Sequence, residues 1–106
     1  MLVLTIDHVP GHRIHSILGE VIGATVRPDN PYSEGVKALD GSDGAFSAAV
    51  IHTRREAVAD LMERAQALGA NVVVGMRFDH RSIGGRYVEV CAYGTAMVVS
   101  RGRLRR

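Results

Sequence analysis

Residues 65–78 read Ala-Gln-Ala-Leu-Gly-Ala-Asn-Val-Val-Val-Gly-Met-Arg-Phe, and this stretch decides the fold. It closes a segment whose apolar side chains share one sector of about 100° on a helical wheel, namely Val50, Ala57, Val58, Leu61, Ala65 and Leu68. Gly69 predicts the end of that helix, because glycine adopts the left-handed conformation without strain. Residues 72–78 predict a buried strand directly after it. The stretch therefore predicts an amphipathic helix packed on a sheet.

The rest of the chain supplies the other elements. Strands are expected at residues 2–6 and 13–26, and a slip of the apolar alternation near Gly19 predicts a β-bulge there. Asn30 before Pro31 is typical of a helix start, so we expect a short helix over 31–39 and a loop over 40–44. Gly84-Gly85 predicts a hairpin turn before a last strand over 87–100. The predicted fold is α+β, a mainly antiparallel four-stranded sheet packed with one long and one short helix.

Composition indicates one folded domain with a basic tail. The 106 residues are 46% hydrophobic, which is ordinary for a globular protein. Four of the 13 basic residues fall in residues 101–106, so we divide the chain into a single domain over 1–100 and a basic C-terminal tail over 101–106. Cys91 is the only cysteine, which favours a reducing compartment and a cytoplasmic protein. No apolar run approaches the ~20 residues of a membrane helix, so no membrane partner is expected.

The residue pattern of the last strand predicts that both faces of the sheet are packed against another layer. Its even positions from Val88 to Val98 are small or apolar and suit a face covered by the long helix. Its odd positions include Cys91, Tyr93 and Met97, which are poorly suited to water. Either the short helix or another subunit must cover them, and apolar surface of this extent usually marks an interface. We therefore predict a homo-oligomer.

Arg54 is the one charged residue inside the apolar sector of the long helix. One interpretation is that its side chain extends along the apolar surface and reaches solvent. The other is a buried or interfacial ion pair, because a desolvated charge needs a partner. Candidate partners are Asp79, Glu89 and Glu20.

The residues carry no catalytic or metal-binding constellation. The serines lack the Gly-x-Ser-x-Gly elbow of a hydrolase, and Cys91 on a strand is expected to be inert. Arg77 and Asp79 share a strand face and fit a structural ion pair better than a catalytic cleft. His8 and His12 flank a Pro-Gly turn and are the candidate metal ligands, although two imidazoles alone make a poor site. No catalytic residue and no cofactor are predicted, a divalent metal remaining the one candidate.

The chain resembles the YbjQ family. The resemblance covers residues 1–100 and rests on Val9-Pro10-Gly11-His12-Arg13-Ile14, on Gly23 with Thr25-Val26-Arg27, on residues 54–79 and on Ala92-Tyr93-Gly94-Thr95-Ala96. It implies an α+β fold and a ring-like homopentamer of bacterial and archaeal origin, in a family without an assigned activity that carries a heavy-metal-binding label. The loop over 40–46 and the arginine tail depart from the family pattern.

Three functions are compatible with these observations. The first is a non-enzymatic binding or scaffold module that works as an oligomer. The alternative is a metal-binding protein whose site is assembled between subunits. Nucleic acid is not an expected partner, except through the arginine tail.

Overall fold

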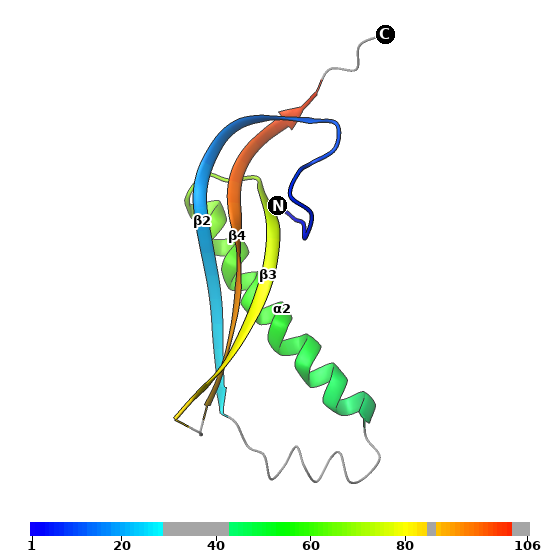
Figure 1. Ribbon diagram of the computed structural model, residues 1–106, viewed down its shortest axis with the longest axis vertical. Coiled ribbons are helices and arrows are strands. Elements are labelled where there is room, and N and C mark those ends of the chain that lie inside the picture. Colours follow the sequence, from blue (N-terminus) through cyan, green and yellow to red (C-terminus); the bar gives the residue numbers. More distant parts are fainter. Residues whose placement is uncertain (29–42, 85–86, 103–106) are drawn as a thin grey trace.

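A computed structural model describes residues 1–28, 43–84 and 87–102 of the chain (Figure 1). These residues form one four-stranded sheet with the order β1-β3-β4-β2 and one helix, α2. The elements in chain order are β1 (Leu2–Val3), β2 (His12–Pro28), α2 (Asp43–Ala67), β3 (Val72–Ile83) and β4 (Tyr87–Arg101). The short helix expected over 31–39 lies outside the described residues.

The sheet is mixed, which corrects the predicted strand arrangement. β4 is central and pairs antiparallel with β2 and with β3, as expected. β1 instead pairs parallel with β3, with Leu2 opposite Val72. Parallel neighbours need a long connection, and here the chain passes through β2 and α2 before it returns as β3. Backbone bonds extend the pairing past β1, since the Leu4 N–H donates to the Val73 carbonyl at 2.8 Å.

The two glycines singled out in the sequence do what was predicted. Gly69 has a φ of 90° and ends α2. Its N–H donates to the Gln66 carbonyl at 2.9 Å, and the Ala70 N–H donates to the Ala65 carbonyl at 3.0 Å, which is the Schellman arrangement. Gly19 has a φ of 108°, and the register of β2 shifts between Ile17 and Gly19. The bulge is thereby confirmed.

The start of the long helix differs from the expectation. Residues from Asp43 onward are helical, so the predicted loop over 40–44 is wrong at Asp43 and Gly44. Acidic residues are favoured in the first turn of a helix by the positive end of its dipole, and Asp43 is the first residue of α2. The cost of Gly44, about 1 kcal/mol relative to alanine, is opposed by the alanines at 45, 48 and 49. The tendency of Asp43 and Gly44 to form a turn is outweighed by the tendency of the following alanines to form a helix.

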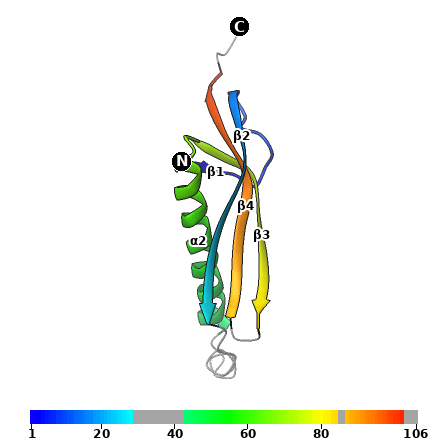
Figure 2. The same cartoon turned by 90° about the vertical axis from the view of Figure 1, so that its left-hand side faces the viewer.

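The core lies between α2 and one face of the sheet. Ala57, Leu61 and Ala65 of α2 are fully buried against small strand residues such as Ala92 and Ala96. Figure 2 shows α2 along one side of the sheet, and the shortest dimension of the molecule is 16 Å, which corresponds to two layers. The last predicted member of the apolar sector, Leu68, is 53% exposed because α2 ends one residue before it.

Contact between helix and sheet is unusually close at Gly23. A Cβ atom at this position would lie 2.2 Å from the Leu61 nitrogen and 2.6 Å from the Ala57 oxygen. Both are backbone atoms and cannot rotate away. Gly23 therefore lets α2 lie directly on β2, and only glycine fits.

The N-terminal segment covers part of the second face. Val72, Val74 and Met97 form a second buried cluster, and Leu4, Val9 and Val99 pack against it. The sequence predicted that these odd positions of β4 need cover, and offered the short helix or another subunit as its source. The structure shows a third source, the chain's own residues 4–9, at one end of the sheet.

Candidate functional site: the open face of the sheet

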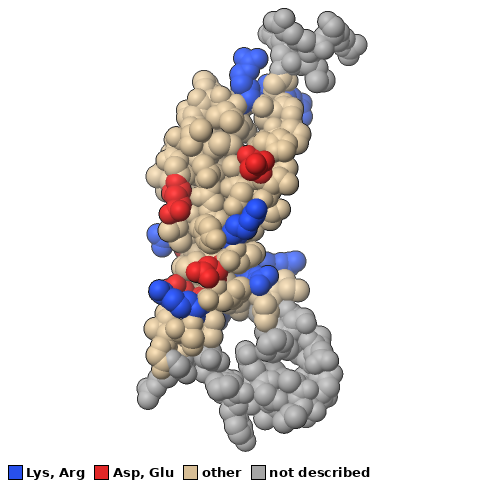
Figure 3. All heavy atoms as spheres, in the orientation of Figure 1, with Lys and Arg blue, Asp and Glu red and all other residues tan. Residues whose placement is uncertain are grey.

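The remainder of the second face has no layer over it among the described residues. Strand register assigns its side chains, because directly opposed residues of antiparallel strands lie on the same face. We call this surface the open face, and by register it includes Glu20, Ile22, Ala24 and Val26 from β2, Tyr87, Glu89, Cys91 and Tyr93 from β4, and Arg77, Asp79, Arg81 and Ile83 from β3. Figure 3 views the molecule from this side and shows separate charged groups on a mostly uncharged surface.

Beyond Glu20, the β2 side of the open face is apolar and exposed. Ile22 lies opposite Tyr93 in the ladder, and the two side chains are 49% and 38% exposed. Val26, four residues along β2, is 51% exposed. Single exposed apolar residues need no explanation, but a contiguous group usually marks a contact surface.

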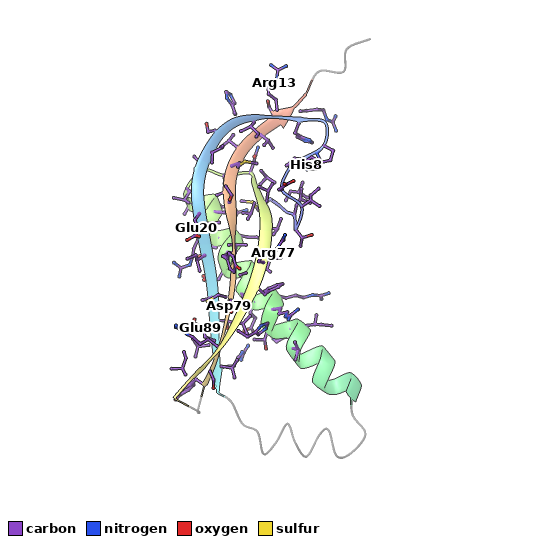
Figure 4. The ribbon with its side chains drawn as sticks, in the orientation of Figure 1. His8, Arg13, Glu20, Arg77, Asp79 and Glu89 are labelled. Atoms are coloured by element: carbon purple, nitrogen blue, oxygen red, sulfur yellow. The ribbon has the colours of Figure 1, made fainter. Side chains whose placement is uncertain are left out.

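The β3 side of the open face is charged. Figure 4 shows Arg77, Asp79 and Glu89 along β3 and β4. The Arg81 guanidinium donates to Glu89 Oε1 at 3.3 Å, and the Arg77 guanidinium donates to the Thr5 carbonyl at 2.8 Å. Arg77 and Asp79 share this strand face, as expected. Arg77 is held by the Thr5 carbonyl, however, and Arg81 by Glu89. The arrangement resembles a solvated surface rather than a catalytic cleft.

Cys91 is a poor nucleophile in this setting. Its thiol donates to Glu89 Oε1 at 3.2 Å. Burial raises the pKa of the Cys91 thiol, and the hydrogen bond and negative charge of Glu89 raise it further. A nucleophilic cysteine needs the opposite, a lowered pKa that favours the thiolate.

Arg54 lies on the other side of the sheet from its predicted partners. Its guanidinium lies 4.9 Å from the centre of the Phe78 ring, and its Nε–H donates to His80 Nε2 at 3.3 Å. Asp79 and Glu89 belong to the opposite face, so the ion pair with either residue is not formed within the chain. Glu20, the third candidate partner, is also unpaired with Arg54 among the described residues. The side chain reaches solvent along an apolar surface, which is the simpler of the two interpretations.

The candidate metal ligands, His8 and His12, have separate partners. His8 Nδ1 lies 3.0 Å from Asp7 Oδ1, and the hydrogen bond to His8 holds the pKa of the Asp7 carboxyl below its ordinary value. His12 Nδ1 lies 2.9 Å from the Pro10 carbonyl oxygen. In the part of the chain that the structure describes, no group of three or more His, Cys, Asp or Glu side chains is arranged to hold a metal ion. A single chain therefore offers no preformed metal site there.

Sequence reasoning missed a polar clamp between α2 and β2. Asp60 Oδ2 accepts hydrogen bonds from the Ala24 N–H and from Arg64 Nε, each at 2.9 Å. One turn earlier, Glu56 accepts from the Thr25 hydroxyl at 3.2 Å and pairs with Arg27. Two carboxylates four residues apart share one helix face, and this spacing was the available signal.

The clamp carboxylates are shifted toward their charged forms. The Ala24 N–H is the largest influence on Asp60 and holds the pKa of its carboxyl below its ordinary value, with Arg64 adding to it. Burial raises the pKa of the Glu56 carboxyl, but the Arg27 charge and the Thr25 hydroxyl outweigh it and lower the net value. Both groups therefore act as structural anions that hold the edge strand to the helix.

Residues 1–100 match the sequence model of the YbjQ family, which carries the description "Putative heavy-metal-binding". The chain belongs to the YbjQ family. A UPF0145 protein from Acidothermus cellulolyticus is 45% identical over 105 residues, which cover 95% of this chain and 97% of the relative. A UPF0145 protein from Streptomyces coelicolor is 44% identical and covers 95% and 99%. These names state no activity.

A solved structure has the same fold. A DUF74-family protein from Pediococcus pentosaceus superposes with a TM-score of 0.66 over 94% of this chain and 98% of its own, at 15% identity. At that identity the likeness concerns the fold alone. In the described residues of this YbjQ-family chain, no helix is both long and apolar enough to cross a membrane.

Proposed function

We propose that this protein is a non-enzymatic binding or scaffold module that works as a cytoplasmic homo-oligomer, with the open face of its sheet as a contact between copies. The supporting observation is the exposed apolar group of Ile22, Val26 and Tyr93 on a sheet face that no described residue covers. A two-layer chain this thin gains a second covering layer when a copy packs on that face. A ring of five copies, as the family resemblance implies, would give every copy the same neighbour on each side.

The absence of catalytic geometry among the described residues is consistent with this role. The Cys91 thiol is held in its protonated form, and Arg77 and Arg81 are engaged by carbonyl or carboxylate oxygens. The single cysteine and the ordinary composition fit a reducing compartment. The module would act by presenting surfaces that several subunits build together.

Subunit count in solution tests the proposal. Sedimentation equilibrium and native mass spectrometry at micromolar concentration should give a multiple of 11.4 kDa, with five copies expected. Ile22→Glu should shift the protein to smaller species, because it places a charge in the apolar contact. Ile51→Glu is the matched control, since Ile51 is 50% exposed on α2 against 49% for Ile22. A wild-type monomer, or equal dissociation of both variants, would remove the open face from the assembly.

Metal binding by a site assembled between subunits is the alternative, and the description of the family model favours it. His8 and His12 are exposed near one end of the molecule, where symmetry can gather one imidazole from each copy. Calorimetric titration of the tag-free oligomer with zinc and with copper should then give fewer ions than subunits, and His8→Ala or His12→Ala should abolish it. One ion per chain, or none, would contradict a shared site.

A further inference from the structure

The paired ends of β2 and β4 carry exposed basic side chains. The start of β2 and the end of β4 are paired there, with His12 opposite Arg101 and Arg13 opposite Ser100. This pairing joins residues 11–19 to residues 96–102, which together contain two arginines, two histidines and no Asp or Glu. Figure 3 shows blue side chains at this end of the molecule.

The described arginines of this end are held on firm backbone and are available. The Gly102 N–H donates to the Gly11 carbonyl at 2.7 Å, which ties the end of β4 to the turn before β2. Within the described part of the chain, neither the Arg13 nor the Arg101 guanidinium has a hydrogen-bond or ion-pair partner, and both are exposed. Figure 4 shows Arg13 at the extreme end of the sheet.

Exposed aliphatic side chains accompany these charges. Ile14 is 55% exposed, Ile17 66% and Leu18 37%, and Ile17 is the most exposed large apolar side chain of the described residues. All three follow Arg13 on β2. Cations beside aliphatic groups match the boundary of a membrane, where lipid phosphates meet acyl chains.

The same residues fit nucleic acid less well. No Phe, Tyr or Trp occurs in 11–19 or 96–102, so the side chains that stack best on bases are missing there. Phosphate contacts would use the arginines but would leave the isoleucines in water. The apolar component therefore favours the lipid surface.

We propose that this basic aliphatic end, formed by Arg13, Ile14, Ile17, Leu18 and Arg101, docks on anionic phospholipid membranes. The expectation of no membrane partner rested on the lack of a spanning segment, and surface binding needs none. Attraction by the lipid charge brings the end to the headgroups, and the aliphatic side chains enter the boundary below them. The open face, farther along the sheet, stays available for the proposed assembly.

Vesicle sedimentation with the full chain tests the proposal. Binding is expected to vesicles of 70% phosphatidylcholine and 30% phosphatidylglycerol at 50 mM salt, and not to pure phosphatidylcholine. Arg13→Ala with Arg101→Ala should lower the partition coefficient about 25-fold, at about fivefold per arginine. Arg55→Ala removes a positive charge from an exposed position on α2 and should leave binding within about twofold, whereas Arg13→Ala alone should lower it about fivefold.

The aliphatic contribution separates membrane from nucleic acid. Ile14→Ser with Ile17→Ser should lower vesicle binding at least tenfold and leave its salt dependence unchanged. Circular dichroism and subunit mass of each variant confirm that fold and assembly persist. Absence of vesicle binding at 50 mM salt would overturn the proposal. So would binding of a DNA duplex that the isoleucine variant retains, since the end would then be a nucleic-acid site.

Discussion

The two faces of the sheet differ in how tightly their side chains are packed. The face under α2 is close-packed with small residues, and at Gly23 it leaves no room for a single carbon atom. The open face keeps Ile22, Val26 and Tyr93 half exposed on a flat surface without a described neighbour. The first face is fully covered within the chain. The second face is fully covered only if another layer packs on it. Fold specificity therefore resides on the helix side, and the other side is the one that we propose for recognition.

The sharpest way to break the packed face is Gly23→Ala. The new Cβ meets backbone atoms of Leu61 and Ala57, so α2 must move off β2. We expect a loss of about 3 kcal/mol or more in the free energy of unfolding, at the upper end of overpacking effects. Urea denaturation followed by circular dichroism measures it. Soluble protein with wild-type stability would show that α2 does not approach β2 so closely.

Removing volume from the same face comes next. Leu61→Ala leaves a cavity at a fully buried position and should cost about 3 kcal/mol. Leu68→Ala makes the same chemical change seven residues later, where the side chain is 53% exposed, and should stay within about 0.5 kcal/mol. Equal losses in the two variants would mean that Leu68 is buried in solution, for instance by another copy.

Acid should loosen the clamp that joins the two layers. The folded-state pKa values of Asp60 and Glu56 lie below their ordinary values of 3.8 and 4.5. Their stabilisation is therefore fully present above these values and is lost as the pH falls below them toward the folded-state pKa. Denaturation midpoints measured from pH 7 to pH 3 should decline below about pH 4.5.

The variant Asp60→Ala measures how much this carboxylate contributes to the free energy of unfolding. Asp60→Ala removes two hydrogen bonds and should cost about 1 kcal/mol at pH 7. Its pH profile should also be flatter than that of the wild type. Glu63→Ala, on an exposed position of the same helix, is the control and should change neither quantity. Parallel pH profiles in all three proteins would exclude the clamp as a source of acid sensitivity.

The smallest effect concerns the open face and its thiol. Because burial and Glu89 raise the pKa of Cys91, less thiolate is present at pH 8 than for a free cysteine. Alkylation by iodoacetamide should be several-fold slower than that of glutathione and should accelerate in Glu89→Gln. A rate that is unchanged in this variant would assign the protection to covering by another subunit instead.

Sequence patterns predicted the elements that depend on local chemistry. The helix stop at Gly69, the bulge at Gly19 and the inward even positions of β4 follow from backbone conformation and periodicity, and all are present. The parallel direction of β1 was not predicted, because it depends on which strand the returning chain meets. The start of α2 at Asp43 was missed because Asp and Gly are common to loops and to first helical turns.

The candidate site was predicted less completely. Periodicity identified the open face through Cys91 and Tyr93, but it could not tell that residues 4–9 cover Met97 and Val99. The sequence left two interpretations open for Arg54, solvent or an acidic partner, and within the chain its side chain contacts Phe78 and His80. Charge alone does not state on which face of a sheet a partner lies, and strand register decides that.

The central place of β4 also bears on how the chain is made. β2 and the longer part of β3 find their hydrogen-bond partners only in β4, which spans Tyr87–Arg101 and is synthesised after them. The ribosome adds roughly 5–20 residues per second. A completed β2 thus waits several seconds as an unpaired strand before residue 87 exists. During this interval Ile14, Ile17 and Ile22 belong to an unpaired strand, the kind of exposed apolar segment that makes folding intermediates prone to aggregate.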